Sequence, residues 1–212
     1  MMIQPYLDRL PLIALLRGVT PEEVLSVADT LIEAGFAIIE VPFNSPRPTE
    51  SIRKLVAKFG DEVLVGAGTV TSPAQVAELT EAGGRLVVMP HCDLEVVRAA
   101  KTTGLACTPG VATPTEGFAA LANGADAIKL FPAELLTPAV LKAMKAVFPS
   151  ATRFLPVGGI TPNAMASYVA ARAAGFGLGS ALYRRGDDPA RVATNARDFV
   201  SVLNRIRGVA GS

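Results

Sequence analysis

The sequence predicts an α/β fold, a (β/α)₈ TIM barrel, and three features of the chain support this prediction. Eight short apolar runs alternate with longer helical segments along the 212 residues. The helical segments repeat one start pattern at a spacing of about 23 residues, the size of one βα unit. No linker or change of composition interrupts the alternation, so we expect a single barrel domain over residues 1–212 with a short N-terminal helical segment. An open doubly wound sheet is the alternative, because one sequence does not reveal strand order.

The expected strands are short apolar runs bounded by glycine, proline or polar residues. They cover residues 12–17, 37–43, 63–69, 85–90, 105–110, 127–132, 153–159 and 175–180.

Helix start and stop signals lie between these runs. In residues 20–35, Thr20 is the expected N-cap and Pro21 the first helical residue. Glu23 stands three residues after the cap, as in a capping box, and Gly35 marks the stop. The pattern returns in residues 71–83, 113–124, 137–149 and 161–175.

Composition limits the partners and the compartment. With 18% charged residues and a formal net charge of +1, the chain has no basic field for nucleic acid, and a small metabolite is the better ligand. Cys92, Cys107 and His91 are the only cysteines and histidine, which argues against disulfides and zinc and predicts a reducing cytoplasm. The N-terminal apolar run is too short for a signal peptide or membrane span.

Two charged residues lie inside runs that read as buried strands. Because side chains alternate along a strand, packing Ile128 and Leu130 under the helices turns Lys129 into the barrel lumen. In the run 37–43 the same alternation turns Glu40 inward. The sequence therefore predicts an amine and a carboxylate that face one cavity.

This pair suits Schiff-base chemistry. A lysine in a low-dielectric lumen has a lowered pKa, so part of it is the neutral amine that attacks a carbonyl. A nearby carboxylate can transfer protons to and from the intermediates. A buried structural ion pair is the competing interpretation of Lys129 and Glu40.

Glycines after the last two expected strands predict a phosphate site, because their N–H groups can approach an anion without a Cβ in the way. The candidates are Gly158, Gly159, Gly179 and Ser180. Arg17, at the end of the first strand, offers a forked cation for a carboxylate or phosphate. Thr69 offers a hydroxyl, with helix capping alongside Thr71 as the alternative.

Motifs along nearly the whole chain resemble a known family. "LLRGVTPEE", "IIEVPFNSP", "VGAGTV", "VVMPH", "TPGVATPTE", "IKLFPAE", "PVGGITP" and "GLGSALY" are similar, in order, to segments of the bacterial class I 2-keto-3-deoxy-6-phosphosugar acid aldolases. The resemblance implies a homotrimeric barrel that needs no metal and no cofactor. It also implies that Lys129 forms the Schiff base and that Glu40 handles protons.

The same resemblance assigns binding roles. Arg17, Thr69 and Pro90 would hold the pyruvate half of the substrate, and Phe131 would form a wall beside it. The phosphate would bind Gly158, Gly159, Gly179 and Ser180.

Two positions separate branches of this family. The gluconate branch usually carries threonine before the paired glycines and arginine after the glutamate strand, whereas this sequence has Val157 and Asn44. These departures resemble the galactonate branch, and imply a lyase of galactonate degradation that cleaves 2-dehydro-3-deoxy-6-phospho-D-galactonate to pyruvate and D-glyceraldehyde 3-phosphate. The C4 epimer, the gluconate substrate, is the alternative. A phosphate-binding barrel without aldolase activity is a third hypothesis.

Overall fold

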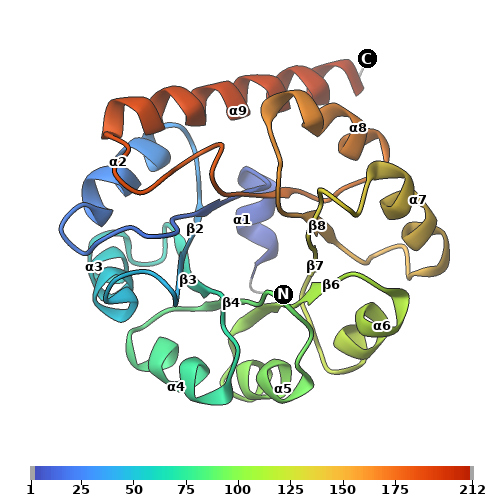
Figure 1. Ribbon diagram of the computed structural model, residues 1–212, viewed down its shortest axis with the longest axis horizontal. Coiled ribbons are helices and arrows are strands. Elements are labelled where there is room, and N and C mark those ends of the chain that lie inside the picture. The colour runs from blue at the N-terminus through green and yellow to red at the C-terminus, as the bar shows by residue number, and fades with distance from the viewer. Residues whose placement is uncertain (1–2, 211–212) are drawn as a thin grey trace.

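The structure, a computed structural model, describes residues 3–210, and none of the helices in this part is long and apolar enough to cross a membrane. All strand pairs are parallel, in a six-stranded sheet of order β5-β4-β3-β2-β1-β9 and a three-stranded sheet of order β6-β7-β8. Helices surround the strands on the outside (Figure 1). The predicted α/β class is confirmed.

The strands are short and lie within the predicted runs, apart from one residue. They are β1 (Leu12–Leu15), β2 (Ile38–Pro42), β3 (Leu64–Gly68), β4 (Leu86–Val88), β5 (Ala106–Thr108), β6 (Gly110–Val111), β7 (Ile128–Leu130), β8 (Phe154–Pro156) and β9 (Phe176–Leu178). The run 105–110 is divided between β5 and β6 at Pro109, because proline has no N–H for the ladder. An isolated parallel bridge between Val157 and Gly177 joins the end of β8 to β9.

The helical elements follow the strands in alternation. They are α1 (Gln4–Arg9), α2 (Val24–Glu33), α3 (Pro48–Phe59), α4 (Pro73–Glu81), α5 (Leu94–Thr102), α6 (Pro114–Ala122), α7 (Pro138–Val147), η1 (Pro162–Ala164), α8 (Met165–Ala170) and α9 (Pro189–Ala210).

The predicted start of the first long helix was wrong. Helix α2 begins at Val24, and the preceding residues form a turn closed by the Glu23 N–H and the Thr20 carbonyl. The Glu23 carboxylate accepts hydrogen bonds from the Thr20 N–H and from the hydroxyl of Tyr183, so it holds the turn to a distant segment. Gly35, with φ of 99°, follows the helix as predicted.

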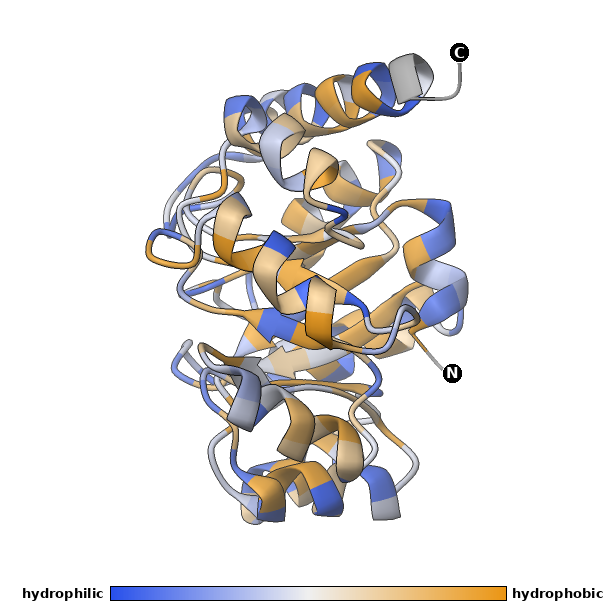
Figure 2. Ribbon diagram, turned by 90° about the vertical axis from the view of Figure 1, so that its right-hand side faces the viewer, coloured by the Kyte–Doolittle hydropathy of each residue, from blue (hydrophilic) through white to orange (hydrophobic). Residues whose placement is uncertain are grey.

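The apolar residues form two separate clusters. One lies between the strands and the outer helices and contains Ile128 and Leu130. The other fills the space enclosed by the strands, where Leu64 and Leu155 meet Leu7 of α1. Figure 2 shows mainly hydrophobic colour on the central strands and both colours on the helices. The molecule therefore has an inner and an outer core.

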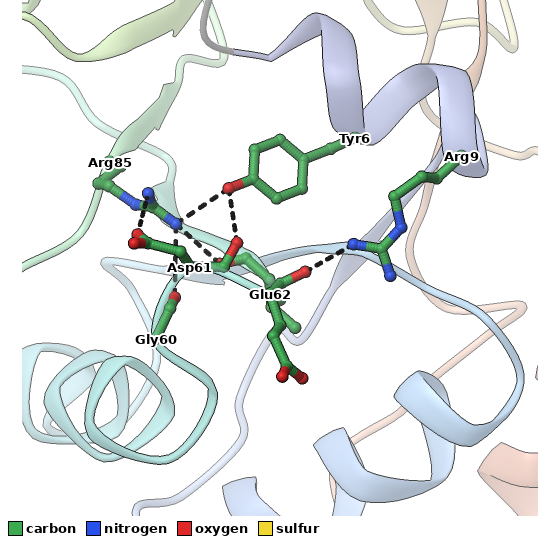
Figure 3. A network of polar contacts seen from close by, with 7 residues as sticks. Tyr6, Arg9, Gly60, Asp61, Glu62 and Arg85 are labelled. Atoms are coloured by element: carbon green, nitrogen blue, oxygen red, sulfur yellow. Dashed lines mark hydrogen bonds and ion pairs between the residues drawn. The ribbon is translucent and has the colours of Figure 1, made fainter.

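Helix α1 closes the amino-terminal end of the lumen. The Tyr6 hydroxyl donates to the carbonyl of Asp61 and accepts from Arg85, which also forms an ion pair with Asp61 at 2.6 Å. Arg9 donates to the carbonyl of Glu62 (Figure 3). These partners precede β3 and β4, so α1 is fixed at the amino ends of the strands, and the carboxyl ends are left for a site.

Candidate active site

Lys129 and Glu40 both lie inside the lumen, as the alternation predicted. Lys129 on β7 is 4% exposed and Glu40 on β2 is 1% exposed. Neither side chain has a hydrogen bond or ion pair with any residue that the structure describes, although each charge shifts the pKa of the other. The two groups are therefore coupled across the lumen and do not form the buried ion pair of the competing interpretation.

Burial controls the ionisation of Glu40. Loss of solvent raises the pKa of this carboxyl to about 7, against the lowering effects of the positive charges on Lys129 and Arg17. Its Oε2 atom has no hydrogen-bond partner. Gly68 provides the space, since a Cβ there would lie 1.8 Å from that oxygen. At neutral pH the carboxyl thus exists in both protonation states, as proton transfer in both directions requires.

Burial also controls Lys129. Loss of solvent lowers the pKa of its amine; the Glu40 charge raises it, and the Arg17 charge lowers it further. The Nζ atom lies 4.6 Å from the ring centroid of Phe131. The environment therefore favours the neutral, nucleophilic amine more than water does.

The raised pKa of Glu40 predicts a pH-dependent stability difference. Between pH 4.5 and about 7 the unfolded chain has lost this proton and the folded chain keeps it, so the folded state loses stability as pH rises through this window. We expect the free energy of unfolding of Glu40→Gln, relative to wild type, to increase by up to about 3 kcal/mol from pH 4.5 to pH 8. Denaturant unfolding at the two pH values measures this, and a constant difference would contradict it.

A cavity of about 490 Å³ opens at the carboxyl ends of the strands. Of the predicted site residues, it is lined by Arg17, Lys129, Phe131, Val157, Gly158, Gly159, Gly179 and Ser180. Among the described residues, Glu40, Thr69 and Pro90 are not part of this lining. Glu40 nevertheless influences the site, because its negative charge raises the pKa of Lys129.

Thr69 has an unusual backbone. Its φ of 55° lies in the left-handed region, which is costly for a β-branched residue. The capping alternative does not hold, because the hydroxyl of Ser72 caps α4 by accepting from the N–H of Gln75. Strain of this kind occurs often at functional sites, and the binding role of Thr69 stays a prediction.

The candidate phosphate glycines differ in their surroundings. Gly158 and Gly159 have φ values of 104° and 64°. The space above them is not open, because Cβ atoms there would lie 2.3 Å from Oε2 and 2.7 Å from Cγ of Glu134. At Gly179 nothing lies within 4 Å of such a Cβ. The sequence did not indicate that a carboxylate covers the paired glycines.

Sequence reasoning also gave too little weight to three polar residues. Arg184 and Arg185, which are not among the predicted site residues, line the cavity beside Ser180. Asn44 accepts a 2.8 Å hydrogen bond from Arg17 through its Oδ1 atom, so it orients the arginine whose charge acts on Lys129. Loop contacts of this kind have no periodic signal; Asn44 stood out only as a departure from a family motif.

The chain is similar to characterised aldolases. The family described as KDPG and KHG aldolase matches residues 3–193. The 2-dehydro-3-deoxy-6-phosphogalactonate aldolase of Escherichia coli K12 is 47% identical over 91% of this chain and 94% of that protein. The 2-dehydro-3-deoxy-phosphogluconate aldolase of Pseudomonas aeruginosa is 36% identical over 70% of this chain and 67% of that protein.

Two solved structures share the fold. The structure described as native KDPGal has a TM-score of 0.93 and 45% identity, over 94% of this chain and 97% of that one. The KDPG aldolase of Legionella pneumophila, with pyruvate captured as a covalent carbinolamine intermediate, has a TM-score of 0.80 and 27% identity, over 95% and 96% of the two chains.

A buried amine and a buried carboxyl group beneath an arginine-lined cavity suit an enzyme that forms a covalent bond to a carbonyl substrate. The sequence match over nearly the whole chain identifies the relevant group of such enzymes. This chain belongs to the KDPG and KHG aldolase family.

Proposed function

We propose that this protein is a class I aldolase, a lyase that cleaves 2-dehydro-3-deoxy-6-phospho-D-galactonate to pyruvate and D-glyceraldehyde 3-phosphate. The single observation that carries the proposal is the pair of Lys129 and Glu40 in one lumen, coupled but not ion-paired. The identity of 47% to a galactonate-branch aldolase supports the choice of substrate.

Lys129 begins the reaction. Its neutral amine attacks the C2 ketone, the C2 oxygen leaves as water, and an iminium ion forms. Glu40 then takes the proton of the C4 hydroxyl through a water molecule as the C3–C4 bond breaks. The bonding electrons pass to the iminium nitrogen, which leaves an enamine and releases the aldehyde. Glu40 returns a proton to C3, and water hydrolyses the imine to release pyruvate.

The predicted binding residues divide between the two halves of the substrate. We expect Arg17, Thr69 and Pro90 to hold the pyruvate half and Phe131 to pack beside the imine. The phosphate binds where Gly158, Gly159, Gly179 and Ser180 line the cavity, with Arg184 and Arg185 nearby to balance its charge.

We propose that the two sheets form one closed (β/α)₈ barrel and one domain. The Val157–Gly177 bridge supports closure at one junction between the sheets, and the continuity of β5 and β6 supports it at the other.

We also propose that the protein forms a homotrimer. The exposed apolar side chains of Phe118 and Val147 support this proposal, because a subunit contact would cover them.

We propose that Val157 lies close to the C4 hydroxyl of the substrate and helps to distinguish the two C4 epimers. It is buried, lines the cavity and pairs with Gly177. Val157→Thr keeps the volume and adds a hydroxyl, and one new hydrogen bond is worth about 0.5–1.5 kcal/mol. We therefore expect the ratio of kcat/KM for the gluconate over the galactonate epimer to rise about 2- to 13-fold. An unchanged or reduced ratio would remove Val157 from this role.

The experiment that tests the proposed substrate is a comparison of cleavage rates on the two purified epimers. We expect a higher kcat/KM for the galactonate epimer. A preference for the gluconate epimer would assign the protein to the other branch with the same chemistry.

A further inference from the structure

Glu134 brings a negative charge into a cavity whose other charged lining residues are cations. Besides Glu134, the described charged residues around this cavity are Arg17, Lys129, Arg184 and Arg185. An anionic substrate gains from the cations and is repelled by the carboxylate. The presence of Glu134 therefore requires a reason.

The Glu134 carboxylate lies against the paired glycines. A Cβ built on Gly158 would lie 2.3 Å from its Oε2, and one on Gly159 would lie 3.1 Å from its Oε1. Glycines with positive φ in a loop after a barrel strand present N–H groups to an anion. In this structure the Glu134 carboxylate lies beside these glycines, where their missing Cβ atoms leave space, and makes no hydrogen bond to their N–H groups.

The backbone around Glu134 is held in place. The N–H of Ala133 donates to the carbonyl of Val157 at 2.8 Å. The buried hydroxyl of Tyr168 lies 2.8 Å from the carbonyl of Ala133 and 3.2 Å from that of Leu136, so it fixes the segment on both sides of Glu134. Glu134 itself is exposed and has no hydrogen bond or ion pair with a described residue, so its side chain is free to turn toward solvent.

We propose that Glu134 is an internal competitor of the substrate phosphate: its carboxylate lies beside Gly158 and Gly159 in the cavity until phosphate binding displaces it. This inference rests on the proposed phosphate site of the aldolase and adds a residue that sets its affinity. A carboxylate within a few ångströms of a bound phosphate weakens binding and assists release of the phosphorylated product. Glu134 thus acts on the phosphate half alone, and the imine at Lys129 does not depend on it.

The test is the dissociation constant of inorganic phosphate, measured by calorimetry for wild type and Glu134→Gln. We expect binding to Glu134→Gln to be about 5- to 30-fold tighter, and the KM for the phosphorylated substrate to fall in parallel. Glu134→Asp, which keeps the charge, should remain close to wild type. Glu81→Gln, an exposed neutralisation on α4, serves as the control for net charge.

Several outcomes would overturn the proposal. These are unchanged or weaker phosphate binding by Glu134→Gln, equal tightening by Glu134→Asp or Glu81→Gln, or no phosphate binding by any variant. Borohydride trapping of pyruvate on the same proteins separates this failure from failure of the aldolase assignment. A trapped imine in every variant leaves the aldolase chemistry intact, whereas its absence from wild type refutes that chemistry.

Discussion

Lys129→Ala is expected to lose aldolase activity by several orders of magnitude. In the proposed mechanism the iminium nitrogen accepts the electrons of the breaking C3–C4 bond, and Lys129 is the one lysine among the described residues that line the cavity. Steady-state cleavage of the phosphorylated substrate measures the loss. Because Lys129 makes no hydrogen bond or ion pair with the described residues, its removal should leave the fold intact.

Lys145→Ala is the matched control for this variant. Lys145 is a partly buried lysine whose pKa is also lowered, but it lies on α7 outside the cavity, where it donates to the carbonyl of Thr152. Its replacement should leave kcat close to wild type. If Lys129→Ala retained even a few per cent of the wild-type rate, the Schiff-base assignment would be wrong.

Glu40→Gln is expected to fold and to lose kcat by about 10²- to 10⁴-fold, the usual effect of removing a general acid and base. The amide fills the space left by Gly68 but neither takes up nor releases a proton near neutral pH. The variant should also lose the pH dependence of kcat near pH 7 that the raised pKa of Glu40 produces. Rates measured from pH 5 to pH 9, in both proteins, test both effects.

Whether Glu40→Gln still forms the pyruvate imine shows which steps of the reaction Glu40 serves. If the imine still forms, Glu40 acts mainly at the C4 hydroxyl and C3. If the imine fails to form, Glu40 also serves the carbinolamine steps. Unchanged turnover would make Glu40 a structural residue only.

The sequence predicted the lumen positions of Lys129 and Glu40 because strand alternation is a strict period of two. Lys129 between Ile128 and Leu130 has only one face available, and the structure places it there. The same reasoning located Glu40. Gly68 escaped notice, although a glycine at a lumen position of the strand beside the glutamate was a usable signal.

Features that depend on contacts between loops were not predictable in this way. The hydrogen bond from Arg17 to Asn44 joins segments 27 residues apart. The position of Glu134 beside Gly158 depends on the hydrogen bond by which Tyr168 holds the carbonyl of the neighbouring Ala133. The start of α2 was misplaced for a related reason. Glu23 makes the bond to the Thr20 N–H that a capping box predicts, but it also accepts from Tyr183, which lies 160 residues away, and the local rule did not foresee that contact or the turn before Val24.

Reduction by borohydride in the presence of pyruvate tests whether Lys129 forms the Schiff base, with the modified residue identified by mass spectrometry of the digested protein. We expect a stable pyruvate adduct on Lys129, absent from Lys129→Ala and retained by Lys145→Ala. An adduct on another lysine, or binding of the phosphorylated substrate with no adduct at all, would contradict Schiff-base formation at Lys129 and favour a phosphate-binding barrel of different function.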